Sequence, residues 1–102
     1  MHLDRFEEAK SVLRKMLPVA RRVLGDSNEL TLGMRWNYAH SLYEDDSATL
    51  DDLRGAVTTL EETERIARRV FGGSYPLAEN IEDALRDARA ALRARETPQE
   101  GA

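Results

Sequence analysis

The sequence contains no cysteine among its 102 residues. This absence excludes disulfide frameworks, cysteine-based metal sites and thiol nucleophiles. Long apolar runs are missing as well, because no stretch approaches the roughly 20 residues that a membrane-spanning helix needs. The first ten residues, "MHLDRFEEAK", lack the apolar segment of a signal peptide. We therefore expect a soluble, cytoplasmic protein that does not bind a membrane.

Positive charge is also in short supply. The 15 Lys and Arg residues are outnumbered by 19 Asp and Glu residues, so the net charge is −4. A nucleic-acid-binding domain usually has the opposite balance. Two arginine pairs, Arg21-Arg22 and Arg68-Arg69, fall near the predicted ends of helices, where cations interact favourably with the negative end of the helix dipole. We expect no nucleic-acid partner.

The chain does contain an internal repeat. The stretch "ARRVLGDSNEL" begins at Ala20, and "ARRVFGGSYPL" begins 47 residues later at Ala67. Seven of the eleven paired positions are identical. A repeat of this length is typical of stacked supersecondary units, each of which buries its apolar face against the next.

Apolar or small residues recur every three or four positions before and within each copy, a spacing that predicts an amphipathic helix. The two rows are Phe6, Ala9, Leu13, Met16, Ala20 and Val23, and then Leu53, Ala56, Leu60, Thr63, Ala67 and Val70. We expect each row to be the buried face of a long helix. Pro18 lies inside the first helix, where we predict a local kink and no break.

Glycine and capping residues mark the ends of the helices. Gly25 and Gly72 can end the two long helices with a positive φ, and a partner helix follows each glycine. Asp26, Ser27 and Asn28 are the possible caps of the first partner helix. Thr49, with Asp52 three residues later, predicts a capping box at the second long helix.

These signals predict an all-α fold of four antiparallel helices in helix-turn-helix repeats. The helices span about residues 3–24, 30–44, 50–71 and 77–95 in one domain, residues 1–95, and residues 96–102 form a disordered tail. The last helix has an apolar side made by Leu77, Ile81, Ala84, Leu85, Ala88 and Leu92.

Several motifs resemble the tetratricopeptide repeats of kinesin light chains. They are Leu24-Gly25, then Thr31-Leu32, then Asn37 with Ala39, and in the second copy Phe71-Gly72 followed by Tyr75-Pro76-Leu77. The repeat of 47 residues is longer than the usual period of about 42 or 34. The last helix lacks the Asn-x-Ala pattern and is strongly charged, as a terminal capping helix would be. The resemblance implies a fragment of a tetratricopeptide-like α-solenoid.

The resemblance also implies a function. In such arrays the first helix of each pair lines a groove that holds an extended peptide, so a peptide or partner protein is expected to contact Trp36, Asn37, His40 and Tyr43. Packing of these side chains in the core or at its rim is the alternative interpretation. A second hypothesis is structural: the open ends of the repeat could mediate self-association through Phe6, Leu13 and Leu17. Both hypotheses are compatible with the chain being a piece of a longer solenoid.

Motifs for chemistry are missing. His2 and His40 do not form a metal-binding pair, and no glycine-rich phosphate loop or nucleophile motif occurs. The acidic loop from Glu44 to Asp52 lacks the central glycine and closing glutamate of a calcium-binding loop, so we expect a solvated loop there. We predict no enzymatic activity, no metal and no cofactor.

Overall fold

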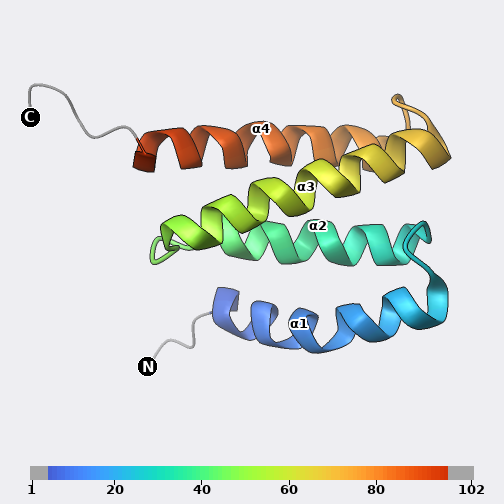
Figure 1. Cartoon of the computed structure of the whole chain (residues 1–102), viewed down its shortest axis with the longest axis horizontal. Helices are drawn as coiled ribbons and strands as arrows, with labels where there is room; N and C mark the ends of the chain where they lie inside the picture. The colour runs from blue at the N-terminus through green and yellow to red at the C-terminus, as the bar shows by residue number, and fades with distance from the viewer. Residues whose placement is uncertain (1–4, 97–102) are drawn as a thin grey trace, which may run out of the picture.

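The computed structural model describes residues 5–96, with side chains from residue 7 onward. All regular elements in this part of the chain are helices: α1 (Arg5–Leu24), α2 (Glu29–Tyr43), α3 (Leu50–Phe71) and α4 (Pro76–Glu96). Successive helices run antiparallel (Figure 1). The predicted all-α, four-helix architecture is confirmed. The last three helices lie within one residue of their predicted ranges, and Glu96, expected to begin the tail, is instead the last residue of α4. The start expected near residue 3 and residues 97–102 of the expected tail lie outside the described residues.

The second helix is at the centre of the packing. α2 packs against α1, α3 and α4, and α3 packs against α4, but α1 makes no close backbone approach to α3 or α4 within residues 5–96. The main apolar cluster belongs to the last three helices and is made by Leu32, Ala39, Leu42, Ala56, Leu60, Ala67, Ala78, Ile81, Ala84, Leu85 and Ala88. None of the α1 side chains that the structure describes, residues 7–24, belongs to this cluster. The first helix is therefore attached to the rest through α2.

The ends of the helices follow the predicted signals. Gly25 and Gly72 have φ values of 94° and 90°, a region that only glycine adopts at low cost. The Asn28 side chain caps α2 by accepting a hydrogen bond from the backbone N–H of Leu30. At α3 the Thr49 hydroxyl accepts from the N–H of Asp52, whose carboxylate accepts from the N–H of Thr49, both at 3.0 Å. The capping box is confirmed.

The row of residues predicted to be buried on α3 is buried except at its end, where Val70 is 45 % exposed. On α1 the prediction is wrong for two residues, because Met16 is 51 % exposed and Val23 is 70 % exposed. Ala20 alone is fully buried in that row; Ala9 and Leu13 are half-buried, and the side chain of Phe6 lies outside the described residues. The physical reason is that α1 has a neighbouring helix on one side only, whereas α3 has one on each side.

Two other expectations concern α4 and Pro18. The apolar side of α4 is buried at Ile81, Ala84, Leu85 and Ala88, while Leu77 and Leu92 are half-buried. The helix α1 continues through Pro18 without interruption, as predicted, and it is visibly bowed in Figure 1. Because Pro18 has no N–H, the carbonyl of Arg14 loses its usual donor, and this loss accounts for a bend in the helix.

An ion pair between a buried arginine and a half-exposed glutamate joins α2 to α3. The guanidinium of Arg35 donates to the carboxylate of Glu62 at 2.7 Å, and the Arg35 side chain is only 8 % exposed. The adjacent Glu61 pairs with Arg89 of α4 at 3.0 Å, but both of those side chains are about half exposed. The two neighbouring glutamates are similarly exposed, but Glu62 pairs with a buried arginine and Glu61 with an exposed one.

We predict that Glu62→Ala lowers the free energy of unfolding by about 2 kcal/mol, because it leaves the charge of Arg35 buried without its partner. Glu61→Ala is the matched control and is expected to cost less than about 1 kcal/mol, since exposed ion pairs contribute little. Urea unfolding followed by circular dichroism measures both values. Equal losses for the two variants would contradict the importance of the buried arginine.

Candidate functional site

An open hollow lies beside the N-terminal half of α2. Its volume is about 630 Å³, and residues of α2 and its cap form most of the wall, with Leu77 at the start of α4. Two of the four residues predicted to bind a peptide, Trp36 and Asn37, line it together with Gly33. We call this feature the α2 hollow.

The three α2 residues give the hollow distinct properties. Trp36 is half-buried and packs against the apolar core, so its indole is a fixed apolar wall. The Asn37 side chain is exposed and makes no hydrogen bond with the side chains or backbone described in residues 7–96, so its amide can both donate and accept. Gly33 has no atom within 4 Å of the place where a Cβ would stand, so a longer side chain there would extend into open space. The hollow therefore offers an apolar wall beside a free amide.

The other two predicted residues lie further along α2 and do not line the hollow. The rings of His40 and Tyr43 meet edge to face, with centroids 5.3 Å apart. His40 is exposed, and its Nε2 lies 3.6 Å from the carboxylate of Glu44. Tyr43 is half-buried against the core. Burial, with the nearby charges of Asp87 and Glu44, raises the pKa of Tyr43 to about 12. This pair is better placed to support the helix packing than to enclose a ligand in the hollow.

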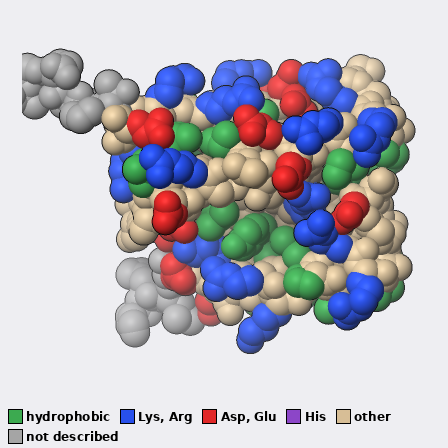
Figure 2. Space-filling view, in the orientation of Figure 1, with side chains coloured by type: hydrophobic (Ala, Val, Ile, Leu, Met, Phe, Trp, Pro, Cys, Tyr) green, Lys and Arg blue, Asp and Glu red, His purple; other side chains and the backbone are tan. Residues whose placement is uncertain are grey.

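A second groove, which the sequence analysis did not identify, runs between α1 and α3. Its volume is about 610 Å³, and its lining includes Leu17, Pro18 and Tyr38 with the guanidinium groups of Arg14 and Arg22. These two arginines form no ion pair within the described part of the chain. Figure 2 shows blue basic side chains beside a green apolar strip between α3 and α1. Because its wall comes from three helices, no single stretch of sequence carries a signal for this groove.

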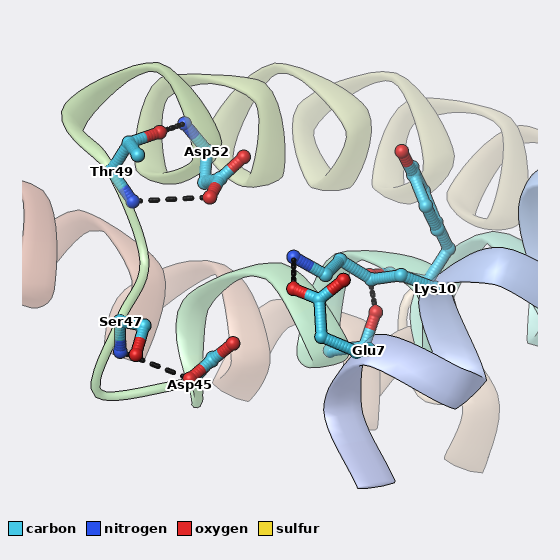
Figure 3. Close-up of polar contacts among 8 residues, drawn as sticks. Glu7, Lys10, Asp45, Ser47, Thr49 and Asp52 are labelled. Carbon is cyan, nitrogen blue, oxygen red and sulfur yellow. Dashed lines mark hydrogen bonds and ion pairs between the residues drawn. The ribbon is translucent and has the colours of Figure 1, made fainter. Parts of the chain in front are cut away.

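The acidic loop before α3 is held by hydrogen bonds, and part of it is buried. The Asp45 carboxylate accepts from the backbone N–H of Ser47 at 2.9 Å (Figure 3). Asp45 and Ala48 are buried, so the expectation of a solvated loop is wrong at these two positions. The carbonyl of Ala48 accepts from Arg95 of α4 at 2.7 Å, and this contact helps to cover the loop.

Lys10 of α1 lies close to the same loop. Its ammonium group is 2.9 Å from the carboxylate of Glu7, and Lys10 is buried (Figure 3). The hydrogen bond that Lys10 donates to Glu7 raises the pKa of Lys10, with smaller contributions from the charges of Glu7, Asp52 and Asp45, against the opposing effect of burial. Within residues 5–96 no group of three His, Asp or Glu side chains is placed to hold a metal ion.

Exposed apolar side chains are concentrated on α1. They are Val12, Met16, Val19, Val23 and Leu24, followed by Leu30 at the start of α2. Two residues expected to mediate self-association, Leu13 and Leu17, are only half-buried, and the side chain of the third, Phe6, lies outside the described residues. The exposed row is thus offset from the residues that the sequence analysis named.

No family model, curated protein or solved structure matches the chain. The resemblance to tetratricopeptide repeats rests on the motifs in the sequence. None of the helices within residues 5–96 combines the length and the apolar character that crossing a membrane requires.

We predict that the chain loses stability as the pH rises from about 10 towards about 12, in part because of Tyr43. An unfolded tyrosine ionises near pH 10, whereas the folded chain keeps the Tyr43 phenol protonated to about 12. Ionisation therefore favours the unfolded state in this window. Urea unfolding at pH 9 and pH 11 should show a smaller fall for Tyr43→Phe than for the wild type. An identical fall in both proteins would contradict the assignment.

Proposed function

We propose that the chain is a non-catalytic protein-interaction module that presents the α2 hollow to a peptide or a partner protein. The observation that supports this proposal is the free amide of Asn37 beside the fixed indole of Trp36 in an open hollow. An asparagine amide can hydrogen-bond both an N–H and a C=O of an extended backbone, and an aromatic wall can bury an apolar side chain. The same surface contains no arrangement of side chains that suggests a reaction.

We further propose that the module is a fragment of a kinesin-light-chain-like tetratricopeptide array that works in the cytoplasm. The order of the packing supports this idea. In the register that the resemblance implies, α2 and α4 are the first helices of successive repeats, and α1 and α3 are second helices. α2 and α4 contact each other, whereas α1 and α3 within residues 5–96 do not. A stack of helix pairs in which the first helices line one side would have this pattern. A soluble scaffold of this kind needs neither a cofactor nor a metal.

The test is a selection of random 12-residue peptides displayed on phage against the full chain. Trp36 is the only tryptophan, so its fluorescence reports directly on whether a selected peptide enters the hollow. We predict that Asn37→Ala weakens the binding of selected peptides about tenfold, because it removes hydrogen bonds worth about 1.5 kcal/mol. Asn80→Ala, on the exposed side of α4, is the matched control and should leave binding unchanged.

A second variant separates binding from folding. Gly33→Gln places a side chain in the hollow and should block the peptide, yet it should raise stability by roughly 0.5 to 1 kcal/mol, because glycine is a poor helix former. Loss of binding in this more stable variant could not be attributed to misfolding. Wild-type affinity in both Asn37→Ala and Gly33→Gln, or a library that yields no binder, would overturn the proposal.

A further inference from the structure

A second apolar surface lies along the open side of α1 and the start of α2. We call it the α1–α2 groove, and its apolar walls are Met16, Val19, Val23, Leu24, Leu30 and Met34. Five of these six side chains are between 41 and 70 % exposed. The one charged residue in the lining is Lys15. An apolar groove of this kind on an otherwise charged chain indicates a contact surface.

The internal repeat shows what such a groove can hold. The residues 47 positions later line the surface between α3 and α4, and α2 packs against both of these helices. There the counterparts of Met16 and Met34, which are Thr63 and Ile81, are completely buried. The counterparts of Val19, Leu24 and Leu30 pack against the apolar core; they are Ile66, Phe71 and Leu77. The counterpart of Val23, Val70, remains 45 % exposed, so the cover ends before this position. The α1–α2 groove is thus the same kind of site without its covering helix.

The covering helix uses a definite set of residues. On α2, Leu32, Ala39 and Leu42 are buried and belong to the apolar cluster shared with α3 and α4. α2 also faces α1, since the Thr31 hydroxyl lies 3.5 Å from the carbonyl of Ala20. A helix in this pose therefore presents an apolar residue, a small residue seven positions later, and another apolar residue three positions after that.

Charge distinguishes the two sites. In the covered site Arg35 of α2 pairs with Glu62 of α3. The counterpart of Glu62 in the open groove is Lys15, which has the opposite charge. A helix that takes the pose of α2 in the open groove therefore needs Asp or Glu at the position of Arg35, three residues after its first apolar residue.

We propose that the α1–α2 groove docks an amphipathic helix of a partner protein, in the pose that α2 adopts on α3 and α4. The docked helix carries apolar residues at positions 1 and 11, a small residue at position 8 and an acidic residue at position 4. This site is separate from the α2 hollow, although the two share the side chains of Leu30 and Met34.

A second copy of the chain fits the groove poorly. The counterparts of Leu32, Ala39 and Leu42 on α4 are Glu79, Arg86 and Arg89, all exposed and charged. Burying this charged face of α4 on Met16 and its neighbours would remove three charged side chains from water and place them against an apolar wall. Pairing α1 with α1 of another copy would bring two Lys15 ammonium groups into one interface, and the groove lining contains no acidic residue to offset them.

The test uses two synthetic helices built on the sequence of α2. Each contains residues 28–44 and a lactam bridge between side chains introduced at positions 33 and 37, because an isolated helix of this length is only marginally stable. One peptide keeps the arginine at position 35, and the other carries Arg35→Glu. Fluorescence anisotropy measures the binding of each labelled peptide to the full chain.

We expect the Arg35→Glu peptide to bind the wild-type chain about fivefold more tightly than the arginine peptide, as one half-exposed ion pair permits. With Lys15→Glu in the chain, the order of the two affinities should invert. Met16→Asp should weaken both peptides at least tenfold, because it places a carboxylate in the apolar wall. Val70→Asp, at an exposed valine of α3 outside the groove, is the matched control and should change neither affinity.

Three results would overturn the inference: no saturable binding of either peptide, binding that survives Met16→Asp, or affinities that do not respond to the charge at Lys15. A concentration-dependent dimer in sedimentation that Met16→Asp abolishes would also overturn it, because a second copy would then occupy the groove. None of the variants of the full chain alters Asn37 or Gly33, so failure here is distinguishable from failure of the proposed function.

Discussion

The fold depends on the burial of α2 on two sides at once. Its Thr31 side faces α1, and its Leu32, Ala39 and Leu42 side faces α3 and α4. A helix covered on two sides cannot have a single apolar stripe, and α2 accordingly carries small or apolar residues around much of its circumference. Only a narrow strip that contains Asn37 and His40 is left facing solvent. The α2 hollow lies on this strip, so the packing of α2 decides where the candidate site can be.

Features that depend on neighbouring residues could be predicted from the sequence. The positive φ of Gly25 and Gly72 and the reciprocal cap of Thr49 and Asp52 involve only a few adjacent positions, and all were found as expected. Burial was harder to predict. The spacing of apolar residues shows that a helix has an apolar face, but it cannot show whether another helix covers that face. Met16 and Val23 are exposed for this reason, whereas Thr63, the counterpart of Met16, is buried.

The candidate site was predictable only in part. Trp36 and Asn37 are adjacent in the sequence and line the same hollow, but His40 and Tyr43 lie one and two turns further along α2, where their rings contact each other. The resemblance to tetratricopeptide repeats predicted which face of α2 contacts a peptide. It could not predict how far along that face the hollow extends. The groove between α1 and α3 depends on the separation of two helices that do not pack together, which no local pattern reports.

The two copies of the repeat have the same residue where the backbone conformation or close packing requires it. They have different residues where the surrounding helices differ. Ala20 and Ala67 are both buried beneath α2 or its counterpart, and the glycines of both copies end their helices. Thr63 tolerates complete burial because its hydroxyl donates to the carbonyl of Thr59 at 2.6 Å.

Met16, its counterpart, is a flexible apolar side chain that can adapt to a partner's surface. At the other end of the stack, α4 has Glu79, Arg86 and Arg89 where α2 has Leu32, Ala39 and Leu42. These charged residues allow α4 to face water. The exposed apolar residues of α1 are poorly suited to contact with water. A stack with one charged end and one apolar end can add a further helix favourably only at the apolar end, because only there does docking remove apolar surface from water without desolvating charge.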